Sequence, residues 1–271
     1  MKEVSQAYAQ LNDGGQIHYR YAGDPANPAI VLLHQTPSHS AMYLPLMAQL
    51  DDHFFVIAPD TPGFGSSDRL TRDCKVEAFA AYLLEFLGAI DIETCMLFGH
   101  HTGAAIAVQM AFDEPERFNA VALSGPTLLS DAQREALHAN AETFAPEKSG
   151  GHFMKMWQRI SGKDASVCLN IVEREVLSAL ACGDYYLASY RAVCAQDFAA
   201  QLPVLSCPVL TFAGDKDVLS SAVEPTLALL RDGRSAILPS GAGTYACEQF
   251  APEVALILRD FFTSVTVPGG Q

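Results

Sequence analysis

The segment Gly99-His100-His101-Thr102-Gly103 constrains the fold of this chain more than any other. Residues 93–98 before it are mostly apolar, as in a buried strand, and residues 103–112 after it are apolar and rich in alanine, as in a helix. Two glycines at this spacing allow a sharp strand-to-helix turn, a nucleophile elbow, which raises its central side chain into a pocket. The central residue is His101, so attack by a serine from this position is excluded.

The rest of the chain alternates between strand and helix patterns. Continuous apolar runs typical of buried parallel strands occupy residues 29–33, 54–58, 120–123 and 208–214, and a further strand is predicted at 235–238. Helical spacing marks residues 42–50, 76–87, 222–230 and 252–262. We therefore predict an α/β fold with a mostly parallel, doubly wound sheet. Strand signals vanish between its two parts, so we expect a core of residues 1–127 and 204–271 with a helical cap at 128–203.

Composition limits the partners that the chain can have. A net charge of −14, with few and scattered Lys and Arg, disfavours nucleic acid and anionic membranes. No apolar run is long enough to span a bilayer. We expect a small-molecule substrate, and the sequence leaves a homodimer open.

Cysteine usage and the N-terminus point to a location. The seven cysteines are widely spread, without a C-x-x-C pair, which favours reduced thiols. Residues 1–5 lack the apolar stretch of a signal peptide. We therefore expect a cytoplasmic protein. No cofactor is expected, because neither a phosphate-binding loop nor a dinucleotide fingerprint precedes a helix.

Four motifs together resemble the α/β-hydrolase fold superfamily, in its capped branch of epoxide hydrolases and esterases. His34-Gln35-Thr36-Pro37 resembles the H-G-x-P oxyanion loop, and residues 60–68 resemble the D-x-P-G-x-G-x-S loop. The elbow is the third motif. Gly214-Asp215-Lys216-Asp217 is the fourth, and it follows a buried strand where the family places its catalytic acid, most often at the second Asp. The resemblance runs from about residue 10 to the C-terminus and implies a hydrolase with a helical cap.

The chain departs from the family pattern at two of the three triad positions. His101 replaces the nucleophile, and Thr244 occupies the position of the usual base histidine, so only Asp217 is retained. Serine hydrolysis needs an imidazole to accept the hydroxyl proton, and threonine cannot do this. We therefore expect His101 to act with Asp217, either as general base on water or as nucleophile. The resemblance implies an oxyanion hole from the backbone N–H groups of Gln35 and Thr102.

The remaining candidates are residues expected to line a pocket beside His101. They are His34, Thr36, His100 and Thr244 in the core and Trp157, Tyr186 and Tyr190 in the cap. Adjacent histidines on an extended strand should point to opposite sides, and the chain has no H-E-x-x-H or H-x-H spacing. We therefore predict a structural or pocket-wall role for His100 and no metal.

Two classes of function remain open from the sequence. The first is an enzyme that hydrolyses an ester, lactone or activated C–C bond in a small, partly hydrophobic carbonyl compound, or one that moves a proton as a lyase or isomerase. The second is an inactive module that binds a small ligand. Loss of serine and base histidine favours the second class, whereas retention of Asp217 favours the first.

Overall fold

The computed structural model describes residues 4–69, 73–139, 144–164 and 166–266. The ends of the predicted core, residues 1–3 and 267–271, lie outside the described part. So do residues 70–72 of the core and residues 140–143 and 165 of the predicted cap.

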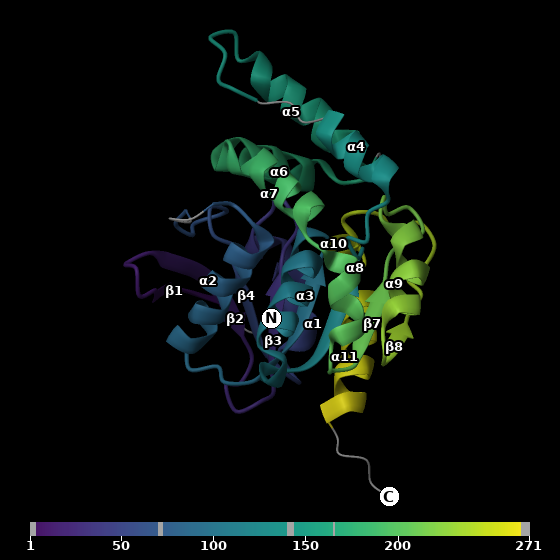
Figure 1. The fold of residues 1–271 in the computed structure, drawn as a ribbon. Helices are drawn as coiled ribbons and strands as arrows, with labels where there is room; N and C mark the ends of the chain where they lie inside the picture. Colours follow the sequence, from purple (N-terminus) through teal and green to yellow (C-terminus); the bar gives the residue numbers. More distant parts are fainter. Residues whose placement is uncertain (1–3, 70–72, 140–143, 165, 267–271) are drawn as a thin grey trace, which may run out of the picture.

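An eight-stranded sheet forms the centre of the molecule, in the order β1-β2-β4-β3-β5-β6-β7-β8 (Figure 1). The strands are β1 (Ser5–Gln10), β2 (Gln16–Ala22), β3 (Ala29–Leu33), β4 (Phe55–Pro59), β5 (Cys95–His100), β6 (Phe118–Ser124), β7 (Val209–Phe212) and β8 (Gly233–Ser235). β2 pairs antiparallel with β1 and β4, and all pairs from β4 to β8 are parallel. β5 is buried at every residue, as a strand covered on both faces must be. The predicted fold class is confirmed.

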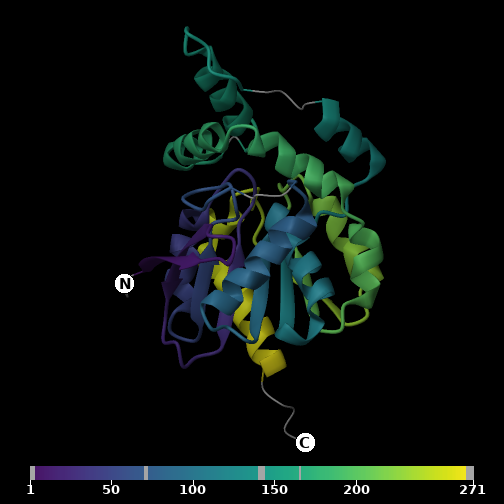
Figure 2. The same ribbon diagram turned by 60° about the vertical axis from the view of Figure 1, so that its left-hand side comes forward.

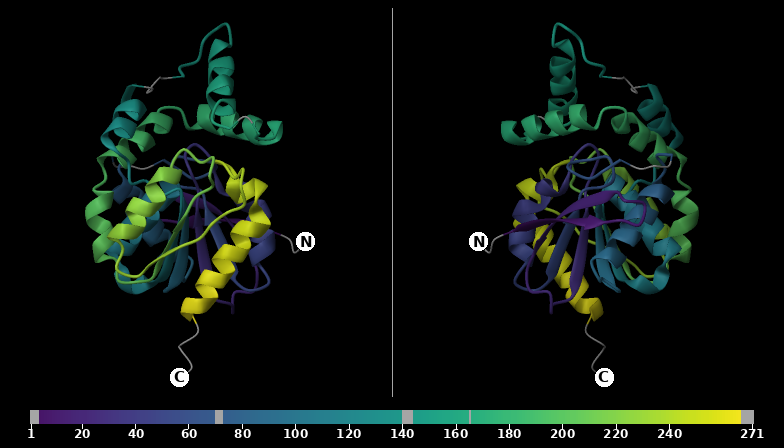
Figure 3. Two further views of the ribbon diagram at one scale, coloured as in Figure 1. Left: turned by 90° about the vertical axis from the view of Figure 1, so that its right-hand side faces the viewer. Right: turned by 90° about the vertical axis from the view of Figure 1, so that its left-hand side faces the viewer.

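Helices cover both faces of the sheet and divide the core into two apolar clusters. One face carries α2 (Val76–Ala89) and α3 (Thr102–Asp113), which pack against each other. The other face carries α1 (Leu44–Leu50) and the closing helix α11 (Ala251–Thr266), drawn in yellow in Figure 3. Shorter elements connect these layers: η1 (Ser40–Tyr43), η2 (Pro115–Arg117), η4 (Ser220–Ala222), α9 (Val223–Leu229) and α10 (Ala246–Gln249).

The chain between β6 and β7 is helical in its described part. It contains α4 (Asp131–Ala139), α5 (Gly151–Ser161), α6 (Leu169–Cys182), α7 (Tyr185–Ala195), α8 (Phe198–Gln201) and η3 (Leu202–Val204). Helices α4 to α7 lie over one end of the sheet, whereas α8 descends beside α3 (Figures 1 and 2). No helix of the described residues is long and apolar enough to cross a membrane.

Two edges of the sheet differ from the sequence-based prediction. The last strand is β8 at Gly233–Ser235 rather than residues 235–238, and Ile237 beyond it is 93% exposed. β1 at the opposite edge was not predicted. Edge strands pair on one side only and are largely exposed here, so their hydrophobic pattern is weak.

Candidate active site

The strand-to-helix turn lies between the end of β5 and the start of α3, and His101 is its central residue. The backbone of His101 has φ 50° and ψ −111°, in the positive-φ range where most side chains are strained. Glycines make the turn possible, because a Cβ atom at Gly99 would collide with the Gly103 backbone. A Cβ atom at Gly103 would collide with the carbonyl of Leu33 on β3.

The side chain of His101 bonds to Asp217 in the loop after β7. His101 Nε2 lies 2.9 Å from Oδ2 and 3.0 Å from Oδ1 of Asp217, and the Leu219 N–H donates to Oδ1 at 2.8 Å. Burial opposes ionisation of Asp217, but the charge and hydrogen bond of His101 prevail and lower its pKa to about 2. An ionised carboxylate only accepts hydrogen bonds, so Nε2 carries the proton and Nδ1 keeps a lone pair in neutral His101.

Gly125, directly after β6, makes room for the imidazole of His101. Its φ is +60°, and a Cβ atom at this position would lie 2.6 Å from His101 Nε2. The ring of His101 is 13% exposed, whereas the carboxylate of Asp217 is 1% exposed. Sequence reasoning missed this role, although a glycine at the carboxyl end of a buried strand was a signal for a close approach.

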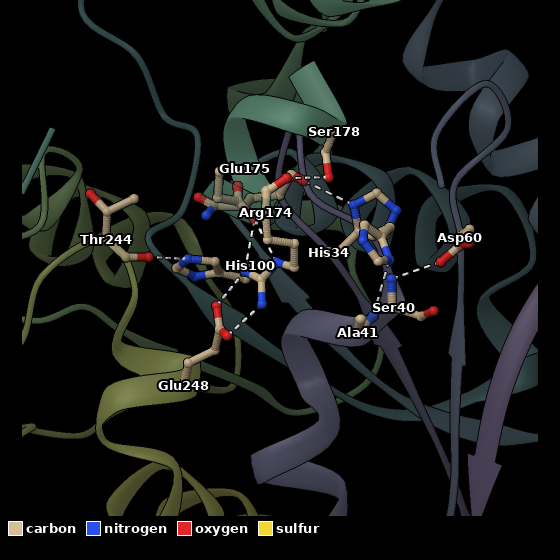
Figure 4. A network of polar contacts seen from close by, with 12 residues as sticks. His34, Ser40, Ala41, Asp60, His100, Arg174, Glu175, Ser178, Thr244 and Glu248 are labelled. Carbon is tan, nitrogen blue, oxygen red and sulfur yellow. Dashed lines mark hydrogen bonds and ion pairs between the residues drawn. The ribbon is translucent and has the colours of Figure 1, made fainter. Parts of the chain in front are cut away.

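His100 is fully buried and holds the loop that contains Thr244 (Figure 4). Its Nε2–H donates to the Thr244 carbonyl at 2.8 Å, and its Nδ1 accepts the hydroxyl of Ser124 at 3.1 Å. Burial, assisted by the nearby His101, lowers the pKa of His100 to about 3. His100 is therefore a neutral positioning residue with both ring nitrogens engaged.

The prediction that the two adjacent histidines point to opposite sides was wrong. Their ring centroids are 4.3 Å apart, with the planes tilted by 36°. Strand alternation ends at His100, because the positive φ of His101 turns the side chain of His101 back toward that of His100.

Nitrogens of His100 and His101 and an oxygen of Asp217 lie within 4.8 Å of one another, a spacing that could hold a cation. The hydrogen bonds at Nε2 of the two histidines oppose a cation bound to these atoms. Nε2 of His100 holds its proton toward the Thr244 carbonyl, and Nε2 of His101 holds its proton toward Asp217. A metal bound through these two Nε2 atoms would have to displace both bonds, because it binds the unprotonated nitrogen. That the site works without metal remains a prediction.

A cavity of about 420 Å³ opens beside the imidazole of His101. Five other residues predicted for the site line it with His101: Gln35, Thr36, Thr102, Tyr190 and Thr244. The remaining lining residues are Thr127, Leu129, Gln133, Ala136, Leu137, Arg159, Lys163, Val193, Val218 and Leu219. Most of these were missed, because their position depends on how the helices after β6 pack over the sheet. Val218 and Leu219 instead follow Asp217 directly in the loop after β7.

Four predicted pocket residues lie outside this lining. His100 is behind His101, and His34 is buried beneath the oxyanion loop, where its Nδ1–H donates to the Gln35 carbonyl at 2.9 Å. Nε2 of His34 accepts the Thr61 N–H at 2.9 Å, so His34 joins two loops. The hydroxyl of buried Tyr186 accepts Arg159 Nε at 2.8 Å, and Trp157 packs half-buried against the core.

Helix α7 contacts the loop after β3 through two side chains. Thr36 donates its hydroxyl to Ser189 Oγ at 3.1 Å, and the Tyr190 hydroxyl donates to the Thr36 carbonyl at 3.3 Å. Both contacts fix the backbone next to Gln35.

The sequence model of the α/β hydrolase fold family matches residues 28–253 of the chain. The chain belongs to this family. Over 98 residues it is 37% identical to an uncharacterized protein of Mycobacterium tuberculosis, a match that covers 36% of this chain and 28% of that protein. The chain thus spans under a third of the length of this relative.

Two further similarities extend over most of the chain. It is 25% identical over 251 residues to the "Putative carbamate hydrolase RutD" of Escherichia coli, which covers 86% of this chain and 90% of the relative. The solved structure of Cfl2 from Burkholderia cenocepacia superposes with a TM-score of 0.80 at 25% identity, covering 95% of both chains. These similarities agree with the observed fold.

Proposed function

We propose that this chain is a hydrolase in which His101, paired with Asp217, acts as general base on a water molecule. One observation carries the proposal: the Nε2–H of His101 bonds to an ionised carboxylate, while His101 lines a cavity. Among the described residues, no hydrogen bond engages Nδ1. The nitrogen with the lone pair is thus available to a water bound in the cavity.

The proposed reaction begins when Nδ1 takes a proton from this water and the oxygen attacks the substrate carbonyl. Asp217 stabilises the imidazolium that forms, as the acid of a serine triad does. The tetrahedral oxyanion accepts hydrogen bonds from the N–H groups of Gln35 and Thr102. Thr102 is suited to this, because the first N–H of a helix has no intrahelical partner. When the intermediate collapses, the imidazolium returns its proton to the leaving group.

The expected substrate is a small, partly hydrophobic carbonyl compound: an ester, a lactone or an activated C–C bond. Apolar side chains from the helices after β6, including Leu137 and Val193, form much of the cavity wall. Partial relatives include proteins named Epoxide hydrolase 3 and Haloalkane dehalogenase 2, and RutD is named for carbamate hydrolysis. These names support hydrolysis in general. In the proposed enzyme, residues 128–203 would serve as the cap over the cavity.

The test is the rate of p-nitrophenyl butyrate hydrolysis by His101→Ala. We expect a loss of about 10² to 10⁴-fold, the usual contribution of a general base, and a smaller loss for Asp217→Asn. His53→Ala is the matched control, because this histidine is exposed and lies outside the cavity. Equal rates for His101→Ala and His53→Ala would refute the proposal.

The position of His101 at the centre of the elbow also favours a second mechanism, direct attack by Nδ1. That route passes through an acyl-imidazole, so stopped-flow mixing would show a burst of one p-nitrophenolate per active site. General-base catalysis gives no burst. A wild-type protein that turns over neither aryl esters nor lactones would instead support the ligand-binding module.

A further inference from the structure

The charged side chains that line the cavity are positive, whereas the net charge of the chain is negative. The chain has 31 acidic and 17 basic residues, a net charge of −14. The described residues that line the cavity nevertheless include Arg159 and Lys163 and no aspartate or glutamate. A concave site lined by one sign of charge concentrates ions of the opposite sign. The cavity therefore favours an anion, although the negative net charge of the chain repels anions elsewhere.

Two tyrosines of α7 hold these cations at the cavity. Arg159 Nε donates to the Tyr186 hydroxyl at 2.8 Å, and Lys163 Nζ donates to the Tyr190 hydroxyl at 3.4 Å. Burial raises the pKa of both tyrosines to about 12. The phenols are therefore neutral and position the cations without cancelling their charge. No ion pair among the described residues includes Lys163.

Lys163 also lies close to the reacting end of the site. The Tyr190 hydroxyl that it contacts donates in turn to the Thr36 carbonyl at 3.3 Å. One phenolic oxygen thus separates the ammonium group from the loop whose Gln35 N–H faces the proposed oxyanion. Lys163 and His101 line the same cavity, so an anion at Lys163 and a carbonyl beside His101 can belong to one small molecule.

We propose that the substrate carries a carboxylate that binds to Lys163, with the charge of Arg159 on the same cavity wall, a short spacer away from the carbonyl at His101 and with an apolar group against Leu137 and Val193. This inference rests on the proposed function for the role of that carbonyl, whereas the anion site itself depends only on binding. A carboxylate oxygen accepts a charge-assisted hydrogen bond from an ammonium group, and such bonds are roughly twice as strong as those between neutral groups.

The test is calorimetric titration with 4-phenylbutyrate and its neutral amide, 4-phenylbutyramide. We expect the wild-type protein to bind the carboxylate at least about tenfold more tightly, the effect of one charge-assisted hydrogen bond. Lys163→Gln should remove most of this preference and leave the affinity for the amide within about twofold, which also reports that the variant is folded. Lys155→Gln is the matched control, because Lys155 belongs to α5 but is exposed and pairs with Glu147 outside the cavity.

Equal affinity of the wild-type protein for the two ligands, or no binding of either, would overturn the anion site. So would a Lys163→Gln variant that keeps the full preference. The same titration with His101→Ala separates the two proposals. A preference that survives in this variant supports the anion site even if His101 has no role in turnover.

Discussion

His100 and His101 are neighbours in the chain with opposite environments. His100 is sealed in the core, with both nitrogens bonded and a pKa lowered to about 3, mainly by burial. His101 bonds Asp217 through one nitrogen and faces the cavity. The difference arises from the positive φ of His101, because β5 ends at His100 and the chain turns at the next residue.

The buried neutral state of His100 makes stability depend on pH. An unfolded histidine titrates near 6.5, whereas folded His100 stays unprotonated down to about pH 3. The unfolded state therefore binds the extra proton as pH falls below 6.5, and stability decreases by about 1.4 kcal/mol per pH unit in that window.

We expect His100→Gln to reduce this dependence, because the amide can bond to Ser124 and Thr244 but does not titrate. The remainder comes from His34 and His39, whose pKa values burial also lowers. Urea unfolding at pH 7 and pH 5 measures the change, with exposed His53→Gln as control. Parallel stability curves for wild type and His100→Gln would contradict the assignment.

At the scale of elements, an ion cluster joins α6 to α10 (Figure 4). Both terminal nitrogens of Arg174 donate to the carboxylate of Glu248 at 2.6 Å, and Arg174 also bonds to Glu175 at 2.8 Å. Glu175 is fully buried. Removing one partner of a buried ion pair leaves an uncompensated charge, which is strongly destabilising.

We expect Arg174→Leu to lower the free energy of unfolding by about 3–5 kcal/mol. Arg234→Leu is the matched control, because Arg234 is exposed and lies 4.0 Å from Asp232; its loss should cost about 1 kcal/mol or less. Urea denaturation compares the two. A similar small loss for both variants would show that α6 is held to the core by apolar packing alone.

Sequence reasoning predicted elements well where the signal was local. The buried runs at β3, β5 and β6 and the glycines around His101 are contiguous in the chain, so their structure could be anticipated. The packing of α5 and of the residues that follow it could not be anticipated, because Arg159 in α5 and Lys163 just after it are held at the cavity by long-range contacts with α7. The orientation of His101 relative to His100 was missed because it depends on the positive φ of His101, which strand periodicity does not encode.

At the scale of the whole molecule, the chain has the α/β hydrolase fold, and our proposal implies that two side chains separate it from a serine triad. Asp217 lies in the loop after β7, and Thr244 lines the cavity with its backbone held by His100. We expect His101→Ser with Thr244→His to hydrolyse p-nitrophenyl butyrate about 10²-fold faster than His101→Ser alone, because only the double variant has a base for the hydroxyl.

Adding Asp217→Ala to the double variant should erase this gain, and mass spectrometry should detect an acyl group on Ser only when the base is present. A folded double variant no faster than His101→Ser would show that the cavity has diverged beyond these two positions.

The central claim, that the imidazole of His101 supplies the base, is tested most directly by chemical rescue. Removing this ring leaves space beside Gly125 and Asp217, which free imidazole can enter. The measurement is the rate of p-nitrophenyl butyrate hydrolysis by His101→Ala as imidazole is added, corrected for the reaction without protein. We expect a low initial rate that rises with imidazole and saturates, while His53→Ala shows no such gain. A His101→Ala variant that matches the wild-type rate without imidazole would contradict the account.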